Sequence, residues 1–323
     1  MRIIGSAVGI RIHAPEDAYF SYFNSPYIGH DIGSAIDIYP RHQKWNGDIV
    51  SPVSGKIVRI KKMRMGKPRQ FPTDEFDYGI GIIPEESESD IVRIMHCKPS
   101  VLEGESIGLG DQIGTAIRSR YFNYWTGPHY HVEILPQNAF LRSSNSHPLY
   151  VDYKIESRKS RRTSEMIEFL ISSVTDDNII GYAESLDHST VGDLVGLSAA
   201  TKKERISGIL DGGLSHYRIG GVIGASDLKK NDQVYLSDSC AGIVREAKSG
   251  ASLFTRGPSI MSYLDNIELR GLSCFIYSRY YTKRKTPQLI LIPKRYGQFN
   301  KIFNEGDLCE LRITSRNNTV KAN

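Results

Sequence analysis

Short runs of alternating apolar and polar residues dominate the first half of the chain. Gly, Pro, Asp and Asn separate these runs, as turn residues separate strands. A period of two places successive side chains on opposite faces, so each run is typical of a β-strand with one face turned toward a core. The runs are AIDIYP, GDIVSPVSGKIVRIKKM, YGIGIIP, DIVRIMHC, QIGTAIRS and HYHVEIL. The pattern predicts a mainly β domain over residues 1–150.

Residues 136–150 interrupt the strand pattern and mark the end of this domain. A basic cluster follows, made of Arg158, Lys159, Arg161 and Arg162. Beyond it, four apolar residues recur at the spacing of one helical face and predict a helix: Met166, Ile167, Leu170 and Ile171. We therefore expect a basic, partly helical linker over residues 151–185. Gly-rich, β-like runs then resume and predict a second β-rich domain of unknown role over residues 186–323.

Composition narrows the class of protein. Hydrophobic residues make up 40% and charged residues 24% of the 323 residues, which is usual for a globular protein long enough to build two cores. No apolar run reaches the ~20 residues of a membrane-spanning helix, and the opening segment lacks the apolar stretch of a signal peptide. The expected compartment is the cytoplasm, and no membrane partner is expected.

The cysteines and the net charge exclude further classes. The four cysteines lie far apart with no CxxC pair, which argues against a disulfide framework and against a cysteine-rich zinc site. A net charge of +5 is too small to indicate nucleic-acid binding by itself, so a nucleic-acid partner is not expected. Such binding would depend strongly on salt.

The segment TGPHYHVEIL, residues 126–135, carries the most informative chemistry. Residues i and i+2 of a strand face the same way, so His129 and His131 project from one face. Asp37 alternates with two isoleucines and is expected to meet His131 from a neighbouring strand. Burying such polar groups without partners is costly, so together they indicate a bound ligand. Catalytic zinc sites use three ligands drawn from His, Asp and Glu, and His30 and His96 are further candidates.

The order of these residues resembles that of the lysostaphin-like zinc metallopeptidases, which have the duplicated hybrid motif fold. The resemblance covers about residues 29–135 and rests on GHDIGSAID, SPVSGKIV, a lone His after a strand, GDQIGTA and TGPHYHVEI. It implies a barrel-sandwich-like first domain. It also implies that His30, Asp37 and His131 hold zinc, while His96 and His129 are catalytic. The implied activity is metal-dependent hydrolysis of a peptide or amide bond in a peptide or protein substrate.

One spacing departs from that family. The family's first ligand His lies four residues before the Asp, a position that Gly33 occupies here, whereas His30 lies seven residues before Asp37. We expect an extra bend in HDIGSAID, provided by Gly33 and Ser34, to bring His30 to the metal.

Other interpretations remain open. The domain is alternatively a non-catalytic metal-binding or scaffold protein that uses a degenerate peptidase fold to bind a partner. His13 and His42 are reserve ligands. SPVSGKIVRIKKM also resembles biotinyl and lipoyl carrier domains, although their carrier lysine sits in a tight turn, whereas Lys61 and Lys62 continue a strand. Cys97 follows His96 directly, but adjacent strand residues face opposite ways, which argues against a Cys–His nucleophile pair.

Overall fold

The computed structural model describes residues 1–41, 44–151, 153, 157–159, 166–201, 206–217, 219–224, 228–248, 250–256, 260–278, 281 and 286–315. Strands account for 53% of it and helices for 4%, which confirms the mainly β class. The chain divides into two compact units: unit 1 is Met1–Tyr22 with Tyr27–Val151, and unit 2 is Phe23–Pro26 with Asp152–Asn323. Among the described residues, no helix is long and apolar enough to cross a membrane.

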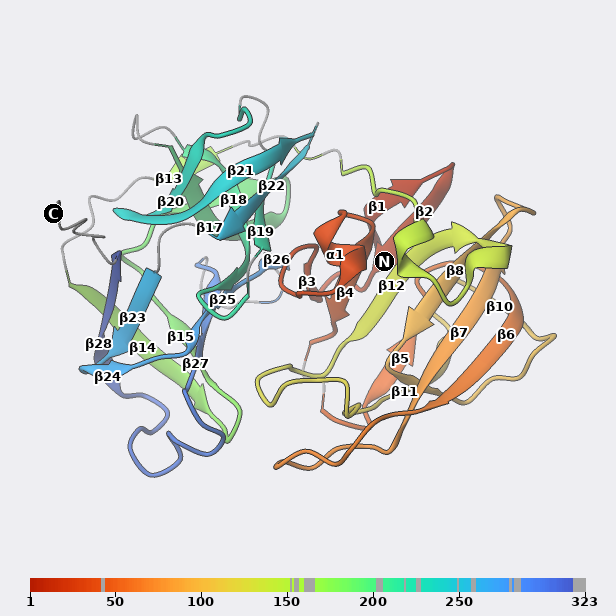
Figure 1. Ribbon diagram of the computed structural model, residues 1–323, viewed down its shortest axis with the longest axis horizontal. Helices are drawn as coiled ribbons and strands as arrows, with labels where there is room; N and C mark the ends of the chain where they lie inside the picture. Colours follow the sequence, from red (N-terminus) through yellow and green to blue (C-terminus); the bar gives the residue numbers. More distant parts are fainter. Residues whose placement is uncertain are drawn as a thin grey trace, which may run out of the picture. The chain divides into compact units, whose positions relative to one another are not determined.

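Unit 1 is built from antiparallel strands with one short α-helix and two 3-10 turns (Figure 1). Its elements are β1 (Arg2–Ala7), β2 (Ile10–Ala14), β3 (Tyr19–Ser21), α1 (Ile28–Asp31), β4 (Ala35–Tyr39), β5 (Asp48–Val50), β6 (Gly55–Arg64), β7 (Phe76–Pro84), β8 (Asp90–Met95), β9 (Cys97–Pro99), β10 (Ser106–Ile107), β11 (Gln112–Ala116), β12 (Tyr130–Pro136), η1 (Gln137–Ala139) and η2 (Ser143–Asn145). Neighbouring strands follow the order β3–β4–β12–β8–β7–β6–β10. β5, β11 and β9 form a smaller sheet, and β1 pairs with β2.

The central strand β12 is buried on both faces. Tyr130, Val132 and Ile134 are fully buried on one face, where the alternating pattern predicts a core. Its other face carries His131 and Glu133, because the side-chain period of a strand is two. The core therefore fixes the register of β12, since a slip of one residue would turn the polar face into the apolar side.

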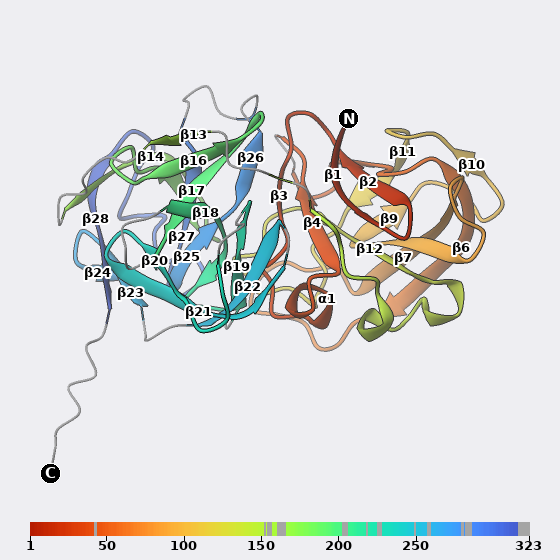
Figure 2. The same ribbon diagram turned by 90° about the horizontal axis from the view of Figure 1, so that it is seen from above.

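Unit 2 is built from strands, and six of them close into a barrel. Its elements are β13 (Ser157–Lys159), β14 (Ile167–Val174), β15 (Ile179–Tyr182), β16 (His188–Val191), β17 (Leu194–Ala200), β18 (Ile206–Leu214), β19 (Ile219–Ile223), β20 (Gln233–Leu236), β21 (Ser239–Ala247), β22 (Ala251–Arg256), β23 (Ile260–Leu264), β24 (Ile267–Glu268), β25 (Gly271–Cys274), β26 (Ile276–Ser278), β27 (Gln288–Ile292) and β28 (Leu308–Ser315). Pairings run β17–β18–β19–β22–β21–β20 and return to β17, which closes a ring of six strands (Figure 2). The described strands of unit 1 form one row of pairings, a separate three-stranded sheet and the pair β1–β2. The barrel-sandwich-like first domain that the family resemblance implies stays a prediction.

The prediction of a helix in the linker is wrong. The segment forms strand β14, paired with β15 on one side and β28 on the other. Ile167, Phe169 and Ile171 are buried, while Glu168 between them is exposed, so the segment follows a period of two. Branched and aromatic side chains suit a strand, and pairing on both sides overrides a helical spacing that rested on four residues. Of the basic cluster, Arg158 and Lys159 lie in β13, and the other two residues fall outside the described part of the chain.

Candidate metal centre

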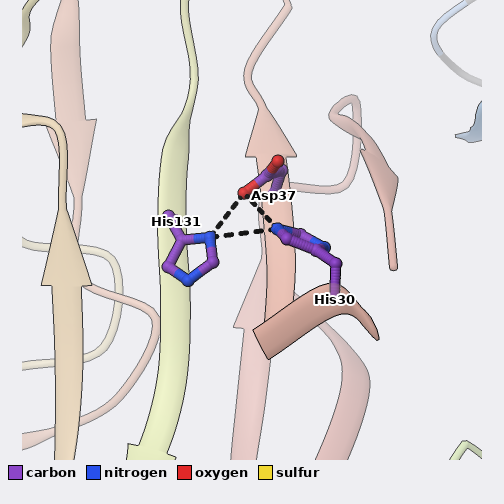
Figure 3. Close-up of side chains that lie close together, drawn as sticks. All are labelled: His30, Asp37 and His131. Carbon is purple, nitrogen blue, oxygen red and sulfur yellow. Dashed lines mark hydrogen bonds and ion pairs between the residues drawn. The ribbon is translucent and has the colours of Figure 1, made fainter. Parts of the chain in front are cut away.

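Three of the expected residues converge inside unit 1. Asp37 comes from β4 and His131 from the adjacent strand β12, where the two residues are directly paired, which confirms their expected register. His30 comes from α1 and points toward both (Figure 3). One ligand atom of each residue lies within 4.8 Å of the others, and all three residues are buried.

A turn after α1 accounts for the long spacing between His30 and Asp37. The N–H of Gly33 donates to the His30 carbonyl at 3.1 Å, and the N–H of Ser34 donates to the Gly29 carbonyl at 2.7 Å. Gly33 has φ +69°, so this is the left-handed glycine ending of a helix. The bend expected at Gly33 and Ser34 is present, and one turn of helix takes up the additional residues.

The three facing atoms have separations that suit a small metal ion. His131 Nδ1 lies 2.8 Å from Asp37 Oδ1, His30 Nε2 lies 3.2 Å from the same oxygen, and the two nitrogens are 3.1 Å apart. Tetrahedral zinc with ligands at about 2.0–2.1 Å would place neighbouring ligand atoms roughly 3.3 Å apart. Two imidazoles and one carboxylate also match the donor types found in catalytic zinc sites.

The outer nitrogen of each imidazole has its own acceptor. His30 Nδ1 lies 2.7 Å from the Tyr22 carbonyl oxygen, which can only accept, so this nitrogen carries the proton. His131 Nε2 lies 3.4 Å from Glu133 Oε1, which favours a proton there. When His131 loses the proton that it shares with Asp37, both inner nitrogens direct lone pairs toward the point that the three ligand atoms face. A metal ion would take the place of that proton, and so the residues present fit a metal.

Glu133 is a site residue that the sequence interpretation missed. It is fully buried, faces His131, and its other oxygen forms an ion pair with the buried Arg93. Arg93 also donates to the Phe140 carbonyl at 2.5 Å and to Ser143 Oγ at 2.6 Å. The signal was available, because Glu133 extends the His-x-His alternation by one step. A side chain on Gly29 would overlap the Glu133 carboxylate, so α1 approaches closely only with glycine there.

The two histidines assigned to catalysis lie beside this cluster. His129 precedes β12, and its Nε2 lies 3.7 Å from Asp37 Oδ1, while its Nδ1 lies 2.9 Å from the Gly127 carbonyl. His96 follows β8, and its ring centroid is 5.3 Å from that of His129 and 6.1 Å from that of His131. All five expected residues are therefore gathered in one place. The phenyl ring of Phe122 packs against both histidines, with its centroid 4.5 Å from that of His96 and 5.0 Å from that of His129.

In the metal-free protein, burial and neighbouring charges together lower the pKa of Asp37 and of His129 and raise the pKa of His131. Burial alone would raise the pKa of Asp37, but the charges of His30 and His129 and a hydrogen bond to His131 hold that pKa well below its ordinary value. Burial lowers the pKa of His129 to about 4, despite the nearby Asp37. Burial acts the same way on His131, but Asp37 and Glu133 outweigh it and raise the pKa of His131 to about 9. Metal binding must therefore displace a proton from His131.

The remaining sequence candidates lie elsewhere. His13 is on β2, where its Nδ1 lies 3.3 Å from the Pro52 carbonyl, and His42 falls outside the described residues. Lys61 and Lys62 lie within β6 and not at a turn, unlike a carrier lysine. Cys97 is buried, and burial raises the pKa of its thiol, so the thiolate needed for nucleophilic attack is disfavoured.

The family described as "Domain of unknown function (DUF8155) N-terminal domain" matches residues 12–151, which is most of unit 1. No curated protein matches the chain. The NMR solution structure of lysostaphin aligns with 74% of this chain and 87% of its own, at 16% sequence identity and a TM-score of 0.26. A TM-score of this size does not establish a shared fold.

Proposed function

We propose that unit 1 is a zinc-dependent hydrolase that cleaves a peptide or amide bond. The observation that carries this proposal is the convergence of His30 Nε2, His131 Nδ1 and Asp37 Oδ1, with the Tyr22 carbonyl oxygen 2.7 Å behind His30 and Glu133 Oε1 3.4 Å behind His131. A metal ion bound there would replace the proton that His131 holds against Asp37 in the metal-free protein. The peptide class of substrate rests on the family resemblance of TGPHYHVEI alone.

Each side chain has a separate part in this proposal. His30, Asp37 and His131 hold the metal, and Glu133 orients the His131 ring from behind. Bound zinc would polarise the scissile carbonyl and lower the pKa of a water toward ~7. His96 and His129, whose ring centroids are 5.3 Å apart, flank the centre and move protons during hydrolysis.

A second candidate function is a structural metal site in a binding module. The observation that favours it is burial, because the exposed fractions of His96, His129 and His131 are only 5%, 3% and 8%. Structural zinc sites are closed, whereas catalytic sites keep one position open to water. Both candidates require the same three ligands, and they differ in whether a substrate reaches the centre.

Elemental analysis after zinc loading tests the metal. We expect one zinc per chain in the wild-type protein and a loss of that zinc in His30→Ala, Asp37→Ala and His131→Ala. His147→Ala is a matched control, because His147 is a histidine of unit 1 outside the cluster and has its own carboxylate partner, Asp90, at 2.8 Å. Zinc retained in His30→Ala, or a wild-type protein without zinc, would refute the ligand set.

Hydrolysis of a peptide library, followed by mass spectrometry, separates the two candidates. A hydrolase cleaves at least one peptide class with loaded wild-type protein and loses that cleavage in His96→Ala and His129→Ala, which keep their zinc. A protein that binds one zinc and cleaves no peptide or amide in the library is a binding module.

A further inference from the structure

Asp77 is a buried carboxylate that contacts both the ring and the backbone of His96. It lies on β7 and is 1% exposed. Its Oδ2 lies 2.7 Å from His96 Nδ1, and its Oδ1 accepts the backbone N–H of His96 at 3.2 Å. Oδ1 also accepts the N–H of Tyr78 at 2.7 Å. One carboxylate thus holds both the ring and the main chain of His96.

The backbone at His96 needs such an anchor. His96 has φ +66°, a left-handed conformation that costs an L-residue roughly 1–2 kcal/mol. His96 lies between β8 and β9 and breaks the strand alternation there. Met95, the residue before it, is the one that pairs with His131, yet the ring of His96 also faces the metal centre because of this break. The His96 carbonyl accepts the N–H of Ile117 at 3.1 Å. Strained residues of this kind persist where the surrounding contacts over-determine them, and they cluster at functional sites.

The contact with Asp77 also sets the tautomer of His96. A buried carboxylate accepts, so His96 Nδ1 carries the proton and Nε2 keeps its lone pair. A proton gained at Nε2 would then make an imidazolium whose charge is balanced by Asp77 at 2.7 Å. Among the described residues, His129 Nδ1 contacts the neutral carbonyl of Gly127 at 2.9 Å, while the Asp37 carboxylate lies 3.7 Å from the other ring nitrogen. The two histidines therefore differ in their capacity to hold a proton.

We propose that Asp77 is a positioning residue that makes His96, and not His129, the proton acceptor of the centre. The inference rests on the proposed hydrolase function. As a water attacks the amide carbon, His96 Nε2 takes one of its protons while the carbonyl π electrons move to oxygen. When the C–N bond breaks, His96 returns that proton to the leaving nitrogen, so an acid and an amine are formed and His96 is neutral again. Asp77 touches neither substrate nor metal in this scheme.

Histidine tautomers measured by long-range ¹⁵N–¹H correlation test the inference. The chain has nine histidines, and the His96 signals are assigned by their loss in His96→Gln. We expect wild-type His96 to carry its proton on Nδ1, with or without zinc. Asp77→Asn removes the charge and should release His96 into a mixture of tautomers, while the protein still binds one zinc. On a peptide that the wild type cleaves, kcat should fall by about 10²- to 10⁴-fold with KM unchanged.

Asp90→Asn is the matched control, because Asp90 holds His147 Nε2 at 2.8 Å in the same unit and lies at the start of β8. It should leave the His96 tautomer, the zinc content and kcat unchanged. A wild-type His96 protonated on Nε2 would overturn the proposal, and this measurement needs no variant to fold. An unchanged kcat in Asp77→Asn, or an equal fall in Asp90→Asn, would overturn it as well. If wild-type protein binds no zinc, the hydrolase proposal fails, while the tautomer of His96 still reports whether Asp77 positions the ring.

Discussion

Replacing Gly33 by alanine tests whether the turn after α1 delivers His30 to the metal. An L-residue at φ +69° is strained by about 1–2 kcal/mol. The turn relieves that strain only by giving up its bonds to the His30 and Gly29 carbonyls, which tie α1 to β4. If α1 shifts, the same free energy is lost from zinc binding, so the Kd of zinc should rise roughly 5- to 30-fold. Competition with a chromogenic chelator measures this Kd.

Two further variants distinguish an effect of backbone strain on zinc binding from an effect of backbone strain on stability alone. Gly33→Asn should have a smaller effect, because asparagine tolerates the left-handed region. Gly104 has φ +96° in a turn of unit 1, and no atom lies within 4 Å of a side chain added there. Gly104→Ala should therefore lower the free energy of unfolding by a similar amount and leave the zinc Kd unchanged. Equal zinc affinity in Gly33→Ala and Gly104→Ala would refute the role of this turn.

Two other predictions concern His131 and its surroundings. The pKa of His131 is raised to about 9 from an ordinary 6.5, so its protonated form stabilises the metal-free fold fully below pH 6.5, and this contribution disappears as the pH rises through about 9. The urea midpoint of metal-free protein should fall across that window, and a similar fall in His131→Gln would contradict the assignment. Glu133→Gln should lower zinc affinity about 10- to 100-fold, and, by leaving the buried Arg93 unpaired, cost roughly 3–5 kcal/mol of stability. Adding Arg93→Met should recover stability but not zinc affinity, as measured by urea unfolding and chelator competition; recovery of both would show that Glu133 acts only through Arg93.

Local sequence was sufficient for part of the site. The alternation of β12 placed His131 on the face opposite its apolar neighbours, and the isoleucines beside Asp37 did the same for β4. Both inferences depend only on the fixed period of a strand and on the preference of apolar side chains for a core. The same alternation points to Glu133 when it is followed two residues further.

The residues that complete the site came from contacts between distant segments. Asp77 precedes His96 by 19 residues and meets it only because β7 and β8 are paired. No spacing rule within one strand links them. His30 reaches Asp37 through a helix of four residues, which is shorter than any periodic pattern that a sequence can display.

By itself, the sequence determined the mainly β class, the polar face of β12 and the residue types suited to a metal. Tertiary structure decided the state of Ile167–Val174, whose short apolar pattern fits a helix or a strand until β15 and β28 supply hydrogen bonds on both sides. It also brought together the five polar side chains of the candidate metal centre, which are separated by up to about a hundred residues in the sequence, in one buried cluster. Periodicity reports which way a side chain faces, whereas only strand pairing determines what it faces.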